Sequence, residues 1–396
     1  MARLSSECVI SGFALANAAG HERAALHAAL SCGEARFSPR PLFGAAAAPE
    51  RGGAVDEAFF AGAVDRRSAR KLDRGTLMAV AACDAAVADA QLTLQDDELD
   101  RVGMMVGNAT GGWGFVEPSM FELYGHGMPG LNAYVATAWF PAAAQGEFSI
   151  RRHLRGYTKT VAADSLSSGV AVDHALRLIA NGRADAVLAG GTEAPLNALV
   201  VNAYRSAGLL SRRGAYQPFD QRSDGRVLGE GACFLVLEPR ARATERGAKC
   251  YARLTSIGRG HTLSVALRDC LQRADLPARA VDLVMLDAHG SLEADRAEYA
   301  ALEEVFGARE DLRLCAPKTA FGDLVGARTA TDLAIGVLSL LNQTVYPSAR
   351  GGEAPLPCRS GRHVAGRAEP AELAHVLVNA RDEAGRALCF LLSQAA

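Results

Sequence analysis

The sequence predicts an α/β protein built from two similar halves, residues 1–247 and 248–396. Short apolar runs typical of buried strands alternate with amphipathic helical segments along the whole chain. The same order of strands and helices occurs twice, which indicates an internal duplication. The 396 residues are 49% hydrophobic, include 40 glycines and have a mean hydropathy of +0.05. This is enough apolar material for a large, tightly packed core.

The stretch from Tyr157 to Leu196 organises the first half, because it predicts a strand, a sharp turn, a helix and a second strand. Residues 160–163 are apolar and partly β-branched, and the polar residues 164–169 then supply turn and cap chemistry. From Val170 the apolar residues recur at helical spacing, and 184–189 form a buried strand. The tip of such an elbow lies at the positive end of a helix, where a nucleophile would be stabilised.

Run length and periodicity predict the other elements in order along the chain. The expected strands are 7–12, 101–107, 232–237, 251–256, 281–288, 312–316, 374–378 and 387–392. The expected helices are 21–30, 68–91, 262–273, 294–306 and 327–341. The final pair of strands matches the pair that closes the first half, as a duplicated fold requires.

The elbow resembles that of the β-ketoacyl synthases, the condensing enzymes of the thiolase superfamily. Their pattern places an active-site Cys two residues before a Ser-Gly pair, and a later strand closes on Gly-Gly-x-Glu. Ser168-Gly169 and Gly190-Gly191-Thr192-Glu193 match this pattern, so the nucleophile position falls on Leu166. The resemblance implies the thiolase fold, five layers α-β-α-β-α made of two duplicated halves. It also implies a scaffold whose nucleophile is gone, because a leucine side chain cannot attack a thioester.

A second motif lies after the elbow. The segment Pro218-Phe219-Asp220 and the run 224–232, DGRVLGEGA, are similar to the PFD…DG…GEGA run of the ketosynthases. It predicts a glycine-rich turn that leads into a strand. We expect Asp220 and Glu230 to hold backbone amides there, a structural role.

The resemblance implies that two histidines bind the malonyl thioester carbonyl and that a lysine supports the second. His289, in Asp287-Ala288-His289-Gly290-Ser291, matches the first. Lys318 matches the lysine, but Asp323 stands where the second histidine belongs. An ionised carboxylate would repel the enolate that decarboxylation forms. We therefore expect Asp323 to pair with Lys318 in a neutral, structural site.

The last signature of the family is also altered. A Gly-Phe-Gly-Gly run usually follows an Asn near the C-terminus, whereas the segment 379–385, NARDEAG, keeps a single glycine. Of the residues that would act on the substrate, the Cys and the two His, only His289 keeps the residue type that the resemblance implies. Two interpretations of His289 stay open. It is either a structural residue at a strand end, with its hydrogen bonds made within the protein, or a catalyst, and the first is favoured.

Aromatic residues are concentrated between the first half's central strand and the elbow. They make up about a quarter of this segment against 6% of the chain. They are Trp113, Phe115, Phe121, Tyr124, Tyr134, Trp139 and Phe140. An interface or core patch is one interpretation. The resemblance implies another, a segment over the dimer interface that reaches the acyl tunnel, and the two are compatible.

Composition excludes several classes of function. A formal charge of −2 and a pI of about 6.5 do not favour nucleic acid or an anionic membrane. No apolar run approaches the roughly 20 residues of a membrane span, and we expect no signal peptide. Nine scattered cysteines without a CxxC pair indicate a reducing cytoplasm and no metal site. The basic runs 66–70 and 151–152 are either solvated surface or a docking patch for an acidic carrier protein.

Loss of both the Cys and the second His resembles the chain-length factors of type II polyketide systems. These are inactive homologues that pair with an active β-ketoacyl synthase and help to form its product tunnel. Leu166 departs from the Gln often found there and is more similar to the divergent factors of polyene-type systems. The resemblance implies no cofactor of its own, with the phosphopantetheine of acyl carrier protein carrying the substrate.

Two other functions remain open at this point. One is a free-standing ketosynthase-like acyltransferase or malonyl-carrier decarboxylase that works through His289 without a covalent intermediate. The other is a degenerate homodimer that binds acyl chains as a carrier or regulator. A ketosynthase encoded next to this chain would favour the chain-length factor.

Overall fold

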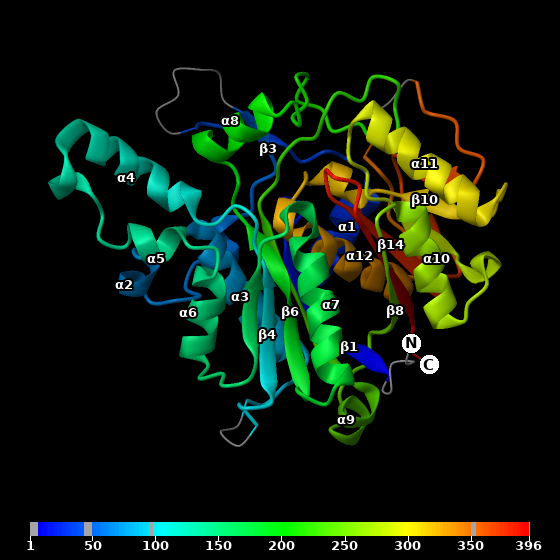
Figure 1. Ribbon diagram of the computed structural model, residues 1–396, viewed down its shortest axis with the longest axis horizontal. Coiled ribbons are helices and arrows are strands. Elements are labelled where there is room, and N and C mark those ends of the chain that lie inside the picture. Colours follow the sequence, from blue (N-terminus) through cyan, green and yellow to red (C-terminus); the bar gives the residue numbers. More distant parts are fainter. Residues whose placement is uncertain (1–6, 43–49, 95–97, 350–353, 396) are drawn as a thin grey trace.

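The computed structural model describes residues 7–42, 50–94, 98–349 and 354–395, and it is a mixed α/β structure (Figure 1). Its main sheet has 11 strands in the order β12-β10-β9-β14-β15-β8-β1-β7-β6-β4-β5. The first half supplies β1 (Cys8–Ala16), β4 (Val102–Gly107), β5 (Thr158–Val161), β6 (Ala186–Glu193) and β7 (Gly231–Pro239). The second supplies β8 (Ala252–Gly260), β9 (Leu283–Met285), β10 (Arg313–Cys315), β12 (Arg362–His363), β14 (His375–Arg381) and β15 (Ala387–Gln394).

The two halves repeat one topology, which confirms the predicted duplication of strand order. In the first, β4 lies parallel to β5 and β6, and β7 and β1 follow antiparallel. In the second, β9 lies parallel to β10 and β14, and β15 and β8 follow antiparallel. Pairing of Cys8–Ile10 of β1 with 252–254 of β8 joins the two sets of strands. Two small pairs lie outside, β2 (Ser38–Arg40) with β3 (Glu50–Gly52) and β11 (Thr344–Val345) with β13 (Glu369–Pro370).

Helices complete the five layers of the thiolase fold. α7 (Ser167–Ala180) and α12 (Arg328–Asn342) lie between the two sets of strands, and α12 contacts β6 and β7 of one and β14 and β15 of the other. α3 (Arg74–Asp89) and α6 (Ala143–Arg151) cover the outer face of the first half. α10 (Leu263–Ala274) and α11 (Leu292–Phe306) cover that of the second. Shorter helices are α1 (Arg23–Ser31), α2 (Arg66–Ala69), α8 (Ala198–Ser206) and α9 (Arg240–Glu245).

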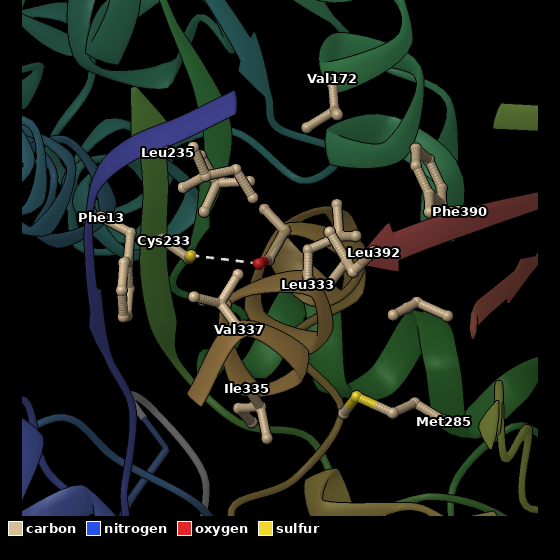
Figure 2. Packing of buried hydrophobic residues seen from close by; sticks show 14 of the residues in the cluster. Phe13, Val172, Cys233, Leu235, Met285, Leu333, Ile335, Val337, Phe390 and Leu392 are labelled. Carbon is tan, nitrogen blue, oxygen red and sulfur yellow. Dashed lines mark hydrogen bonds between the residues drawn. The ribbon is translucent and has the colours of Figure 1, made fainter. Parts of the chain in front are cut away.

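The central helix α12 is buried from Arg328 to Leu340, so its surroundings on every side are protein. Figure 2 shows Leu333 and Val337 of α12 between side chains of β7 and β15. Cys233 of β7 donates a hydrogen bond from Sγ to the carbonyl of Ala330, at 3.2 Å. This thiol is a core residue, as its apolar strand predicts.

Two expected elements differ from the structure. The helix predicted over 68–91 is interrupted, because Asp73 starts a new helix there by accepting a hydrogen bond from the amide of Gly75 at 2.7 Å. The strand predicted over 281–288 is wrong in length: β9 has only three residues, and the chain then bends so that Ala288 has a left-handed φ of +52°. That bend directs His289 into the site described below.

The aromatic segment forms an arm beside the first half. Its helices are α4 (Trp113–His126) and α5 (Val135–Trp139), and Figure 1 shows α4 extending away from the body of the protein. Within the described part of the chain, none of the helices combines the length and apolar character that a bilayer span needs.

Candidate functional site

The predicted elbow is present and carries Leu166 at its tip. β5 ends at Val161, a single turn covers 164–166, and α7 begins at Ser167. Leu166 is 6% exposed and belongs to the largest apolar cluster of the core. Gly107 of β4 lies directly beneath, where a Cβ would come within 2.2 Å of the amide nitrogen of Ser168. The elbow is therefore tightly packed, and its tip is an aliphatic side chain at the start of a helix.

Glu193, from the Gly-Gly-x-Glu motif, holds the loop opposite the elbow. Its carboxylate accepts hydrogen bonds from the amides of Ala109 and Thr110 and from the hydroxyl of Thr110. A Cβ on Gly326 would lie 2.4 Å from this carboxylate, so only glycine fits there. Burial raises the pKa of Glu193 to about 7, although these donors favour its charged form.

Replacing Glu193 by Gln should flatten the dependence of stability on pH. Because the pKa of the buried acid is raised, the folded state binds its proton more tightly than the unfolded state, and stability falls as pH rises from about 4.5 to about 7. The wild type should lose about 2–3 kcal/mol more than E193Q between about pH 5 and pH 8. Urea unfolding at several pH values measures this. Glu34→Gln on the surface is the control, and equal slopes in all three proteins would contradict the assignment.

His289 is engaged by two charged side chains. Its Nε2 lies 2.7 Å from Nη2 of Arg226 and in short contact with a carboxylate oxygen of Glu383. Arg226 also donates from Nη2 to Glu383, at 2.7 Å. Burial disfavours the charge of Glu383, but the hydrogen bond from His289 and the charge of Arg226 outweigh it and lower its pKa to about 2. Glu383 belongs to the segment 379–385, which departs from the Gly-Phe-Gly-Gly that the resemblance implies, and it brings a carboxylate onto His289.

Asp323 is fully buried between two arginines. Its Oδ2 accepts from Nη1 of Arg226 at 2.8 Å and from Nη1 of Arg328 at 3.4 Å, and its Oδ1 accepts from the amide of Val325 at 2.9 Å. Burial disfavours its charge, but Arg328, Arg226 and Lys318 outweigh that cost and hold its pKa at about 2. Asp323 is therefore an ionised carboxylate at neutral pH.

The predicted pair of Asp323 with Lys318 is wrong. Nζ of Lys318 lies 2.5 Å from Asp332 of α12 and donates to the carbonyl of Asp287 at 3.1 Å. Asp323 is held elsewhere, because its amide donates to the carbonyl of Val227 and so places the carboxylate beside Arg226. Its ion pairs are with Arg226 and Arg328 instead.

Arg226 and Arg328 are the residues that sequence reasoning missed. Both are at most 2% exposed and rank among the largest fully buried side chains. They belong to a buried group of ion pairs that also contains Asp287, Glu298, Lys318, Asp332 and Arg381. The only signal was Arg226 itself, an arginine in the glycine-rich run DGRVLGEGA that leads into a buried strand, where a buried charge would need a partner.

Asp220 and Glu230 make the backbone contacts expected of them. Asp220 accepts from the amides of Arg222 and Ala354, at 2.8 and 2.9 Å. Glu230 accepts from the amide of Val55 at 3.2 Å and from Nε of Arg74 at 3.0 Å. No group of side chains among the described residues has the composition of a metal site.

The aromatic arm is mostly exposed. Phe121, Tyr124, Tyr134, Trp139 and Phe140 are between 42% and 83% exposed, whereas Trp113 and Phe115 at its root are partly buried. The rings of Trp113 and Trp139 pack edge to face, 5.9 Å apart. A cavity of about 250 Å³ opens at this root, lined by Phe115, Leu72, Asp73, Arg74, Asn197 and Glu230 among others. The arm is therefore an uncovered aromatic surface beside a cavity, and the structure does not bury it in the core.

Comparison with known proteins agrees with this architecture. Residues 10–243 match the β-ketoacyl synthase N-terminal domain and residues 250–351 match the β-ketoacyl synthase C-terminal domain. The tetracenomycin polyketide synthase ketoacyl synthase beta subunit of Streptomyces glaucescens is 35% identical over 300 residues, 72% of this chain and 73% of that protein. The putative polyketide beta-ketoacyl synthase 2 of Streptomyces coelicolor is 32% identical over 410 residues, 99% and 96% of the two chains.

A solved structure shows the same fold. The ishigamide ketosynthase/chain length factor superposes with a TM-score of 0.87 at 23% identity, and the match covers 100% of both chains. Because both domains match and one relative aligns over nearly its whole length, the chain belongs to the β-ketoacyl synthase family.

Proposed function

We propose that this chain is the non-catalytic, chain-length-factor subunit of a heterodimer with an active β-ketoacyl synthase. It shapes the acyl tunnel of that partner during decarboxylative polyketide or polyene elongation on acyl carrier protein. The observation that carries the proposal is the state of the former active site. Leu166 fills the nucleophile position, and ionised Asp323 is locked between Arg226 and Arg328.

This arrangement opposes both steps of a condensation. Acyl transfer needs a nucleophile, which Leu166 does not offer. Decarboxylation needs donors aimed at a developing enolate, and Asp323 puts a negative charge there instead. Catalysis through His289 alone is disfavoured as well, because Arg226 and Glu383 already occupy its Nε2.

Two surfaces support a partner subunit. Strand β5 is the last strand at one end of the sheet. Among the described residues no strand pairs with its outer edge, so this edge can accept a strand from another subunit. The aromatic arm exposes large apolar side chains, which monomeric proteins rarely leave in contiguous patches. Together they suit a permanent interface of more than roughly 2,000 Å².

A third surface supports contact with an acidic carrier. Arg66, Arg67 and Arg70 are exposed on and just after α2, and none of them forms an ion pair with a carboxylate of the described residues. Unpaired cations on one short helix attract an acidic partner at a distance. We assign this patch to the carrier protein that brings the phosphopantetheine-bound chain to the partner's active site.

Co-expression with an active β-ketoacyl synthase from the same genome tests the proposal. The two chains should co-purify as a heterodimer, and carrier-bound product should form only when both are present, as intact mass would record. Isolation of a stable homodimer that ignores the ketosynthase would contradict the partnership. Product of equal length and yield from the ketosynthase alone would contradict the role in the tunnel.

Within the same assay, the arm should set product length. Trp113→Ala or Phe140→Ala should give longer products, because tightly packed interiors stop a chain where a bulky side chain intrudes. Leu341→Ala, an exposed apolar residue at the end of α12, is the matched control and should leave the product unchanged. Unchanged length across Ala variants of all seven aromatic residues would remove this role.

A further inference from the structure

The open edge of β5 has a defined set of free backbone groups. The carbonyl of Tyr157 accepts a hydrogen bond from the amide of Met104 in β4, and that of Val161 accepts one from Asn108, the residue after β4. Because backbone groups alternate along a strand, those of Thr158 and Thr160 point to the open edge. These two residues can therefore bond a further strand, with Lys159 between them.

Lys159 is exposed and unpaired on one face of this edge. Nε2 of Gln145 on α6 donates to the hydroxyl of Thr158 at 3.0 Å, which places Thr158 on the α6 face. Lys159 points to the opposite face, where its charge acts on His174 of α7. It forms no ion pair with any carboxylate in the described ranges.

The neighbourhood of Lys159 carries further positive charge. Arg183 stands over the ring of Tyr157, 5.5 Å from its centroid. The carboxylates nearest to His174 and Arg183 in the chain, those of Asp173 and Asp185, are already bound by arginines. The edge therefore presents cations without a free carboxylate beside them.

If a second copy of this chain paired with β5, its Lys159 would lie near the Lys159 of the first copy. A two-fold axis that joins two edge strands in one antiparallel sheet stands perpendicular to the sheet, so each side chain stays on its face. Pairing centred on Lys159 sets the two lysines directly opposite, with Cα atoms about 4.5 Å apart as in a non-hydrogen-bonded pair. Pairing centred on Thr158 or Thr160 sets them diagonally, about 7–8 Å apart. Like charges in either arrangement repel.

We infer that Lys159 selects the partner on this edge: it disfavours a second copy of this chain and favours a ketosynthase-fold subunit that presents a carboxylate opposite it. This inference rests on the proposed function, because it assumes that β5 is the edge that the partner covers. It assigns to one side chain the choice between homodimer and heterodimer.

A charge-swap experiment tests the inference with this chain alone. Wild type and Lys159→Glu should each associate weakly, since both place like charges together, whereas their equimolar mixture should dimerise with a Kd at least about five-fold lower. Sedimentation velocity measures this, and about 0.5 M salt should erase the difference. The exposed Lys249→Glu, distant from β5 in the chain, is the matched control. A mixture that associates no more tightly than wild type, or an equal gain with K249E, overturns the inference.

The ketosynthase completes the test. Lys159→Glu should weaken its heterodimer at least about five-fold, and Lys159→Gln should weaken it less. If the Kd of the heterodimer is unchanged although the charge swap promotes dimerisation, the inferred carboxylate on the partner is wrong. Wild type that captures no ketosynthase would instead overturn the proposed function, so the two failures are distinguishable.

Discussion

Replacing Asp323 by Asn is expected to lower the free energy of unfolding by roughly 3–5 kcal/mol, the cost of breaking a buried ion pair from one side. The physical reason is the state of Arg226 and Arg328 afterwards. Both guanidinium groups stay fully buried, and neither can lose its proton at neutral pH. Urea or guanidinium unfolding at neutral pH measures the loss.

The unfolding measurement is interpreted with a surface control variant and a double-mutant cycle. Asp311→Asn removes a carboxylate that pairs with Arg309 at the surface, and it should cost no more than about 1 kcal/mol. Arg226→Gln combined with Asp323→Asn should cost less than the sum of the single changes, because the two residues are bonded at 2.8 Å. Equal small losses for D323N and D311N would mean that the buried pairs do not hold the candidate site together.

Incubation of the chain with acyl-loaded and malonyl-loaded carrier protein is expected to leave its mass unchanged. An acyl-enzyme needs a reactive thiolate at the elbow, and Leu166 supplies none. None of the nine cysteines occupies the elbow position. Burial raises the pKa of several core thiols, that of Cys8 for example to about 12, so these thiols remain protonated. An active ketosynthase under the same conditions is the positive control.

Restoring the family's residue types is a stricter form of this experiment. Leu166→Cys with Asp323→His should still not condense, because Arg226 and Glu383 continue to occupy His289. Adding Glu383→Gly tests that explanation, since it frees Nε2 of His289 from the carboxylate. A covalent adduct that turns over on any cysteine of the wild type would contradict the inactive assignment, and condensation by the double variant would contradict the blocking role of Glu383.

Local pattern predicted most of the elements and the position of the site. The strand, turn and helix around Leu166 follow from apolar periodicity and cap residues that lie next to one another in the chain, and the structure places them as expected. The break at Asp73 was missed because the periodic apolar residues begin only at Leu77 and do not mark where the helix starts. The cap that starts α3 shows only in the hydrogen bond that the amide of Gly75 donates to Asp73.

The sequence by itself determined the family and the duplicated fold, and it predicts the loss of the nucleophile, because each depends on residue type and on spacing along the chain. It also predicts that Asp323 is a charge in the wrong place for a condensing enzyme. Only the tertiary structure decided which cations neutralise that charge. Arg226 lies 97 residues from Asp323 in the chain, and Glu383 lies 94 from His289. Such pairings depend on how loops from both halves meet around α12. A buried charge needs an opposite charge nearby, and the tertiary packing decides which side chain lies close enough to form the ion pair.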